Sequence, residues 1–128
     1  MKFLLDTHAF LWLMDEPERL PQKVLEACQD RGNEIYLSVV SAWEMQIKQQ
    51  IGKLKLPSPL RAIIQRQQEK NNLQILAVEL EHVLALNNLP PHHTDPFDRL
   101  LIAQAQVEDT YLVSSDSLFV EYQVKLWW

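Results

Sequence analysis

Short apolar runs alternate along the sequence with longer segments of helical periodicity, and this alternation limits the possible folds more than any other feature. Runs of four to six apolar or β-branched residues are typical of strands, and they occur at residues 2–5, 35–40, 73–77, 111–114 and 124–127. The connections between them are too long for hairpin turns, which favours parallel strands joined by right-handed crossovers. We therefore predict an α/β protein, a three-layer α/β/α sandwich around a central parallel sheet.

The segments between the strands show apolar residues three and four positions apart, which is typical of amphipathic helices. We predict helices at residues 9–14, 21–30, 42–51, 60–68, 80–86 and 97–107. In the third helix, Trp43, Ile47 and Ile51 recur every four residues and Gly52 stands where a C-terminal capping glycine belongs, so we expect this stripe to be buried. The last helix is apolar nearly all round, which predicts a position in the core.

Length and composition fit a single domain spanning residues 1–128. The chain has no internal repeat and no glycine-rich linker, since Gly32 and Gly52 are its only glycines. The only cysteine, Cys28, cannot form an intramolecular disulfide, which favours a cytoplasmic location. Asp6 interrupts the apolar N-terminal run early, and no later run approaches the roughly 20 residues of a membrane helix, so we expect neither secretion nor membrane insertion.

The formal net charge of −5 argues against a protein that holds nucleic acid by general neutralisation of phosphates. Any contact with nucleic acid must therefore be local. The chain also lacks the G-x-G-x-x-G and Walker glycine-lysine patterns, which disfavours a nucleotide-binding α/β domain.

Two aspartates follow predicted strands directly. Asp6 comes after the strand at 2–5 and Asp116 soon after the strand at 111–114. In open parallel sheets, ligands bind beyond the carboxyl ends of the strands, so both side chains should lie at the functional edge. An aspartate before a helix is also a common N-terminal cap, and taken singly either residue fits that structural role equally well.

Two further acids stand near predicted helix starts. Ser41 and Glu44 have the S-x-x-E spacing of a capping box, which gives Glu44 a purely structural explanation. Thr94 to Asp98 reads as another helix start, with Pro96 in the first turn, and here Asp95 fits the capping role better than Asp98.

As a set, the four acids Asp6, Glu44, Asp98 and Asp116 carry more information than any one of them. Helix capping does not require an acid at each strand-to-helix junction, because Ser, Thr or Asn serves as well. Carboxylates held close together repel one another unless a cation joins them. Oxygen donors without a nearby cluster of Cys or His favour Mg²⁺ or Mn²⁺ over zinc.

The residues around these acids resemble the four motifs of PIN-domain ribonucleases. The stretches are Leu4-Leu5-Asp6-Thr7-His8, Ser41-Ala42-Trp43-Glu44, His93-Thr94-Asp95-Pro96-Phe97-Asp98-Arg99-Leu100-Leu101-Ile102-Ala103 and Ser114-Ser115-Asp116. In order and spacing they cover almost the whole chain, and they are most similar to the VapC-type toxins of bacterial toxin–antitoxin pairs. The block from His93 to Arg99 is the most specific of them.

The resemblance implies a metal-dependent endoribonuclease. It implies that Asp6, Glu44 and Asp98 are the principal catalytic and metal-binding acids, that Asp116 completes the set, and that Asp95 is an accessory residue. It also implies an RNA substrate, a cognate antitoxin protein and self-association into a homodimer. Two positions depart from the family pattern: Thr94 stands where relatives often carry a basic residue, and Asp109-Thr110 replaces a glycine turn.

Two questions stay open at this stage. For His93, a structural or substrate-contact role is favoured over a metal-ligand role. The basic side chains that could contact RNA are Lys48, Lys53, Lys55 and Arg99, although a solvent-exposed charge is the commoner explanation for each. A PIN-like interaction module without catalysis is the main alternative function, and a phosphotransfer domain with an aspartyl nucleophile is a weaker one.

Overall fold

The computed structural model describes residues 1–92 and 94–128. Within these ranges, five strands form one sheet in the order β3-β2-β1-β4-β5, and every neighbouring pair is parallel. The strands are β1 (Lys2–Leu5), β2 (Glu34–Ser38), β3 (Gln74–Leu76), β4 (Tyr111–Val113) and β5 (Lys125–Trp127). The predicted parallel sheet is confirmed, and each strand falls within one of the predicted runs or begins one residue before it.

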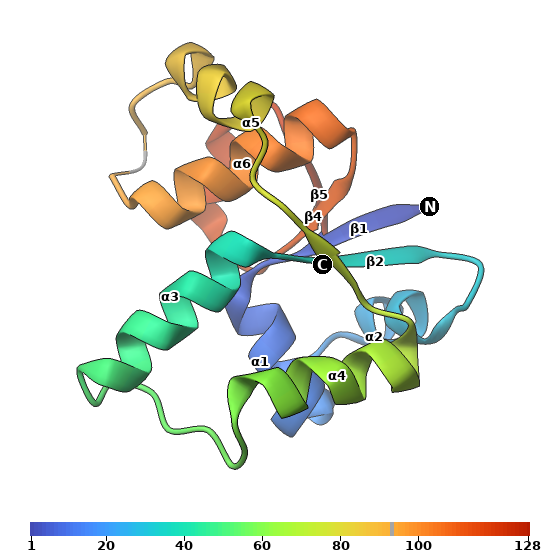
Figure 1. Ribbon diagram of the computed structural model, residues 1–128. Coiled ribbons are helices and arrows are strands. Elements are labelled where there is room, and N and C mark those ends of the chain that lie inside the picture. Colours follow the sequence, from blue (N-terminus) through green and yellow to red (C-terminus); the bar gives the residue numbers. More distant parts are fainter. Residues whose placement is uncertain (93) are drawn as a thin grey trace.

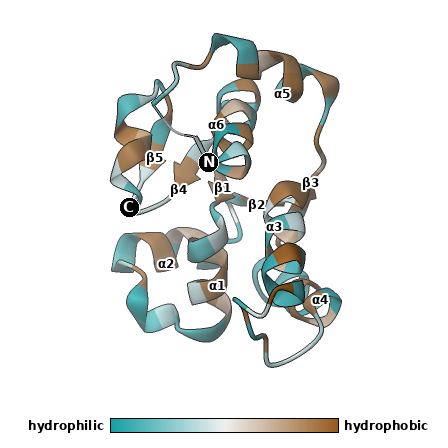
Figure 2. Cartoon of the chain, turned by 90° about the vertical axis from the view of Figure 1, so that its left-hand side faces the viewer, coloured by the Kyte–Doolittle hydropathy of each residue, from teal (hydrophilic) through white to brown (hydrophobic). Residues whose placement is uncertain are grey.

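Helices cover both faces of this sheet (Figures 1 and 2). In the described ranges they are α1 (Thr7–Asp15), α2 (Gln22–Gln29), α3 (Val39–Gln50), α4 (Leu60–Asn71), α5 (Leu80–Ala85) and α6 (Pro96–Glu108), with short 3-10 helices η1 (Pro17–Arg19), η2 (Leu86–Asn88) and η3 (Ser117–Glu121). Figure 2 shows α1, α2 and α4 on one side of the sheet and α5 and α6 on the other. This is the predicted α/β/α sandwich.

Alternation along β1 divides the core between the two faces. Phe3 and Leu5 pack in the cluster that contains the buried residues of α1 and α2, whereas Leu4 packs in the cluster that contains α6. The period of two along a strand produces this division. Helix α3 contributes to both clusters, through Met45 on one side and Val40 on the other, so it lies at the junction of the two layers.

The start of α3 differs from the prediction. Val39 and Val40 were expected to extend the strand, but Ser38 ends β2 and caps α3, because its hydroxyl accepts a 3.0 Å hydrogen bond from the Val40 amide. Ser41 is therefore inside the helix, and its buried hydroxyl has no hydrogen-bond partner among the described residues. The capping box proposed for Ser41 and Glu44 is wrong, which removes the structural explanation for Glu44.

The stripe expected to bury α3 was also wrong. Trp43 is 60% exposed and Ile51 is 59% exposed, whereas the buried residues of the helix are Val40, Ser41, Glu44 and Met45. Helix α3 thus turns a carboxylate inward and an indole outward.

Two backbone positions explain how the helices end. Gly52 follows α3 with a φ of 77°, which suits glycine. Asp109 caps α6 in the same left-handed region, with a φ of 54°, and its carboxylate lies 3.0 Å from the Lys125 ammonium. The departure at Asp109 therefore preserves the turn that glycine would make.

Across residues 1–92 and 94–128, no helix combines the length and apolarity needed to cross a bilayer.

Candidate active site

The sheet order changes direction between β1 and β4, and such a switch point is where open α/β sheets bind ligands. Asp6 follows β1 directly, and Ser114, Ser115 and Asp116 follow β4. A cavity of about 150 Å³ lies at this edge. Its lining includes all four predicted acids, Asp6, Glu44, Asp98 and Asp116, together with Asp95, Thr7, His8, Lys48, Ser115 and Phe119. Residues from four separate segments of the sequence therefore meet there.

Asp6 is one of the buried groups of this cavity and is 8% exposed. It caps α1, and its Oδ1 accepts a 2.7 Å hydrogen bond from the Ala9 amide. Burial raises the pKa of Asp6 above its ordinary value of 3.8, and the charge of Asp116 raises it further, against the opposing effects of a hydrogen bond from Ser114, the Ala9 amide and His8. The carboxylate form is thus held where added positive charge would stabilise it.

Glu44 projects from α3 into the same cavity and is 7% exposed. Its Oε1 accepts a 2.7 Å hydrogen bond from the Thr7 hydroxyl, and its Oε2 lies 2.8 Å from the Lys48 ammonium. Thr7 stands one residue after Asp6, so this contact joins the start of α1 to α3.

Asp98 and Asp116 are placed by the starts of their helices. Asp95 caps α6, and its Oδ1 accepts hydrogen bonds from the amides of Phe97 at 2.8 Å and Asp98 at 3.3 Å. Asp116 caps η3 by accepting a 2.9 Å bond from the Leu118 amide, while its own amide donates a 3.0 Å bond to the Ser114 hydroxyl. Asp95 thus acts on the backbone beside Asp98, in keeping with an accessory role.

The chemistry of this cavity fits a hard divalent cation. All four acids offer oxygen donors, and the cavity has room for several water molecules, which Mg²⁺ usually keeps. Among residues 1–92 and 94–128, however, no three His, Cys, Asp or Glu side chains stand close enough to form a complete metal site. Binding would therefore require small movements of side chains or water-mediated contacts. Burial and the neighbouring charge of Asp116 both raise the pKa of Asp6, and a bound cation would lower it again.

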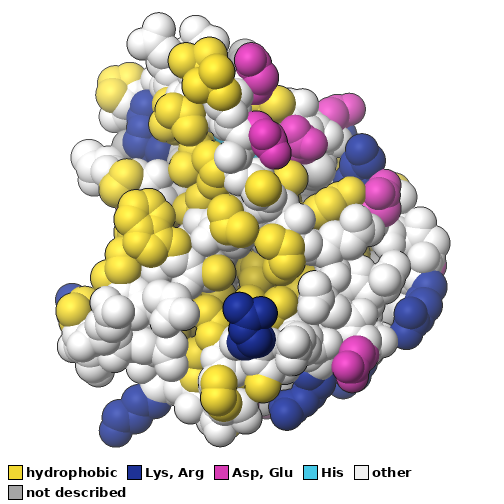
Figure 3. Space-filling model, viewed as in Figure 1, with side chains coloured by type: hydrophobic (Ala, Val, Ile, Leu, Met, Phe, Trp, Pro, Cys, Tyr) yellow, Lys and Arg dark blue, Asp and Glu magenta, His cyan; other side chains and the backbone are white. Residues whose placement is uncertain are grey.

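A larger groove of about 430 Å³ lies between α3, α4 and β3, and none of the four acids lines it. Its lining is mostly apolar and includes Trp43, Leu60, Ile64 and Ile75, with Arg61 as its charged side chain. Figure 3 shows hydrophobic side chains gathered over this face, with a basic side chain among them. The helical segment predicted at residues 60–68 lines one side of this groove. Because Trp43 faces the groove and Glu44 faces the cavity, α3 forms part of both.

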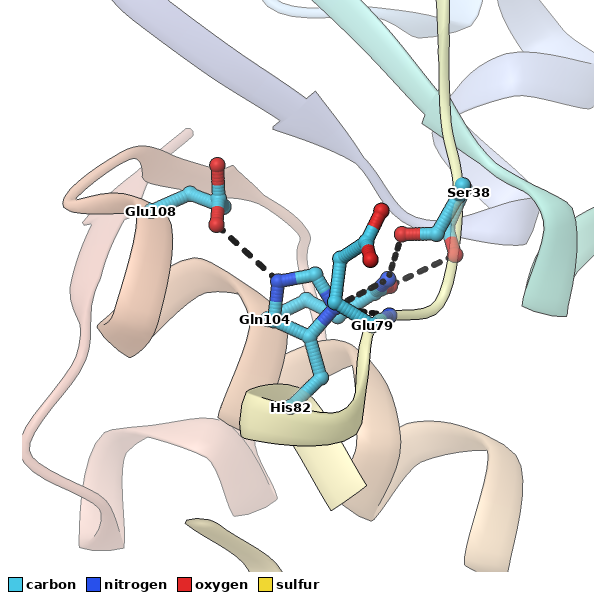
Figure 4. Close-up of polar contacts among 6 residues, drawn as sticks. Ser38, Glu79, His82, Gln104 and Glu108 are labelled. Carbon is cyan, nitrogen blue, oxygen red and sulfur yellow. Dashed lines mark hydrogen bonds and ion pairs between the residues drawn. The ribbon is translucent and has the colours of Figure 1, made fainter. Parts of the chain in front are cut away.

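A buried polar network ties together the two helices that carry Glu44 and Asp98 (Figure 4). The Ser38 hydroxyl, which caps α3, donates to Oε1 of Gln104 in the middle of α6. The Gln104 amide donates to the Ala77 carbonyl at 3.2 Å and lies 3.3 Å from His82 Nδ1. Nδ1 of His82 also accepts a 2.9 Å bond from the Glu79 amide, which leaves Nε2 to donate to Glu108 at 3.0 Å. Sequence analysis gave no role to His82 or Gln104.

The other residues considered from the sequence have mixed outcomes. Lys48 lines the cavity, whereas Lys53 and Lys55 are exposed outside its lining. The Arg99 guanidinium donates to the Pro90 carbonyl at 2.9 Å, which is a structural contact. His93 lies outside the described residues, so its expected role has no structural account.

Thr7, His8, Ser115 and Phe119 line the cavity without having been predicted as site residues. Their positions next to Asp6 and Asp116 in the sequence were the available signal.

Comparison with known proteins places these features in a family. The family model described as PIN domain matches residues 3–125. No curated protein sequence matches the chain. Among solved structures, this chain superposes on a chain of VapBC2 from Rickettsia felis with a TM-score of 0.73 at 17% identity. The superposition covers 98% of this chain and 96% of that chain, and the VapBC2 structure contains a DNA fragment from the promoter of these proteins.

Two further structures have the same fold at similarly low identity. DNA-bound VapBC from Salmonella typhimurium gives a TM-score of 0.70 at 15% identity, and FitAcB from Neisseria gonorrhoeae gives 0.64 at 16%. Each comparison covers 98% of this chain and 96% of the other chain.

Proposed function

Because the chain belongs to the PIN domain family, we propose that it is a Mg²⁺- or Mn²⁺-dependent endoribonuclease, with residues 1–128 as a single nuclease domain. The observation that carries this proposal is the cavity at the β1–β4 switch point, where Asp6, Glu44, Asp98 and Asp116 meet. We assign metal binding and catalysis to these four acids.

The residues of the chain divide the work of the reaction between them. Asp6 and Asp116 follow neighbouring strands and Glu44 and Asp98 lie on α3 and α6, and these four residues would hold the ion. A bound divalent ion supplies an activated water and stabilises negative charge on the phosphodiester. Thr7 orients Glu44, and Asp95 fixes the backbone beside Asp98.

RNA is the proposed substrate because of the resemblance to PIN-domain ribonucleases, and the acidic chain implies that phosphates are met locally. The decisive test is cleavage of total cellular RNA by the purified protein in Mg²⁺ or Mn²⁺. We expect discrete products that disappear with EDTA and with the Asp6→Asn variant. The matched control is Asp15→Asn, which changes an exposed acid at the end of α1 and should leave cleavage unchanged.

The main alternative, a PIN-like interaction module, makes a different prediction in the same assay. Such a protein would bind Mn²⁺ or a partner but would release no RNA fragments under any metal condition. Equal cleavage by the wild-type protein and by Asp6→Asn would indicate a contaminating nuclease and would contradict the assignment of Asp6.

We further propose that a cognate antitoxin binds in the groove between α3 and α4, in the cytoplasm. By their descriptions, the three related structures are VapBC2 and VapBC, both bound to DNA, and FitAcB. The groove suits an apolar helix face, and Arg61 would favour an acidic residue on it. Trp43 also contacts Phe97, next to Asp98, with 5.0 Å between ring centroids, so Trp43 connects the groove to the helix that carries Asp98.

This partner can be tested with a candidate antitoxin by titration calorimetry. Trp43→Ala should weaken its binding by at least about tenfold, since buried aromatic anchors dominate such interfaces. Ile51→Ala is the control, because Ile51 is equally exposed on the end of α3 but does not line the groove. Similar losses from both variants would place the partner elsewhere.

Self-association into a homodimer is the remaining part of the proposal. Helix α5 exposes Leu80 (68%) and Leu84 (56%), which are apolar side chains that a second copy could cover. Sedimentation velocity should show a dimer that Leu84→Glu dissociates, and a monomer at all concentrations would refute it.

A further inference from the structure

Lys48 is a basic side chain in the lining of an acidic cavity. It lies one turn after Glu44 on α3 and lines the acidic cavity, where its ammonium is 2.8 Å from Oε2 of Glu44. The Lys48 side chain is 38% exposed, whereas that of Glu44 is 9% exposed. The other oxygen of Glu44 is occupied by the Thr7 hydroxyl. Glu44 therefore has both oxygens engaged by groups of the protein itself.

The charges around the cavity are strongly unbalanced. Its described lining contains five carboxylates, those of Asp6, Glu44, Asp95, Asp98 and Asp116, and the single lysine or arginine side chain of Lys48. Like charges at this spacing repel and an adjacent cation relieves the repulsion. The Lys48 ammonium contacts Oε2 of Glu44, so it competes with any other cation for that oxygen.

We propose that Lys48 is the built-in counter-ion of the metal-free site, an inference that rests on the proposed metal-dependent function. A divalent ion that binds Glu44 must displace or share the position of the Lys48 ammonium. The displaced side chain, with its flexible four-carbon stem and its outer part in solvent, then faces the position of an RNA phosphate. Lys48 is thus a positioning residue that opposes metal binding and favours substrate binding.

An ordinary ion pair within the helix is the alternative explanation, and it predicts a different effect of removing Lys48. Glu and Lys four residues apart on a helix commonly form an ion pair that contributes slightly to helix stability. If that were the whole role of Lys48, its removal would slightly lower stability and leave metal affinity unchanged. The counter-ion role predicts effects of opposite sign on metal and on RNA.

The test is Mn²⁺ titration of the full-length protein by calorimetry, comparing wild type with Lys48→Met. We expect Lys48→Met to bind Mn²⁺ about three- to tenfold more tightly, because a competing charge in a partly exposed site has been removed. Lys48→Arg should restore affinity toward that of wild type. The control Lys70→Met removes an exposed charge at the end of α4, outside the cavity, and should change affinity less than twofold.

RNA cleavage at saturating Mn²⁺ supplies the second measurement. Lys48→Met should raise the KM for RNA several-fold while its metal affinity improves. Unchanged or weaker Mn²⁺ binding by Lys48→Met, in a wild-type protein that binds Mn²⁺ and cuts RNA, would overturn the counter-ion role alone. Absence of Mn²⁺ binding by both proteins would overturn the proposed function as well.

Discussion

Replacing Gln104 with leucine should test whether the buried polar network holds the two halves of the site together. Gln104 is completely buried in α6 and connects three elements. It accepts a hydrogen bond from Ser38, donates one to the Ala77 carbonyl and lies 3.3 Å from His82 Nδ1. Leucine has a similar volume, so Gln104→Leu removes the hydrogen bonds without leaving a large cavity.

The magnitude follows from the groups left without a partner. The Ser38 hydroxyl loses a buried acceptor, at a cost of about 1–3 kcal/mol, whereas the Ala77 carbonyl belongs to an exposed residue and can bond to water instead. His82 Nδ1 keeps its bond from the Glu79 amide, so it adds little. Greater burial of apolar surface offsets part of this loss, and the net destabilisation should be about 2 kcal/mol. That is a large part of the roughly 5–15 kcal/mol by which domains are stable.

Equilibrium unfolding in urea measures this effect. With a slope of about 2 kcal/mol per molar urea, the midpoint should fall by about 1 M. Gln106→Leu is the matched control, since it makes the same substitution on an exposed position of α6 and removes only a 3.0 Å bond to the Gln123 carbonyl. A shift for Gln104→Leu no larger than that of the control would refute the structural role of the network.

Three further predictions concern single side chains. Burial raises the pKa of Asp6 in the folded protein above 3.8, so the stability gained by its protonation is lost as pH rises through that pKa. In EDTA, Asp6→Asn should therefore be more stable than wild type, by a margin that grows as pH rises above 4. A margin that stays constant with pH in urea unfolding would contradict this. Burial raises the pKa of Cys28 to about 11, so a thiol reagent at pH 8 should modify this thiol rapidly in the unfolded protein and only through transient unfolding in the native protein. Rapid labelling of Cys28 in the native protein would contradict its burial. Thr7→Val removes the donor to Glu44 and should cost about 1–2 kcal/mol in thermal or urea unfolding, whereas an unchanged protein would mean that water replaces the hydroxyl.

The fold could be predicted largely from local patterns. Each strand is a short apolar run, and the connections allow only crossovers, so the parallel sheet follows from general rules. The start of α3 could not be predicted in this way, because Val39 and Val40 are β-branched and continue the strand pattern. Only the hydrogen bond from the Val40 amide to the Ser38 hydroxyl shows that the helix begins there.

Two acids of the candidate site, Asp6 and Asp116, were predicted from topology, since they follow strands that the sheet brings side by side. Glu44 and Asp98 were assigned through the resemblance to PIN-domain ribonucleases. The residues that support these acids were not predicted. The bonds of Thr7 to Glu44 and of Ser38 to Gln104 join positions 37 and 66 residues apart, and no local pattern predicts such pairs. The prediction that Trp43 is buried was wrong for a related reason. Helical spacing indicates an apolar face, but it does not show whether that face packs in the core or lines a surface groove.

The pairing of β1 with β4 has a consequence for when the site comes into existence. Leu5 lies beside Val113, and this long-range contact is what brings Asp6 and Asp116 together. A chain that is still emerging from the ribosome, or one that has lost β4, contains most of the acids but holds them apart. Asp6 and Asp116 therefore come together only when the first strand of the chain pairs with a strand near its other end.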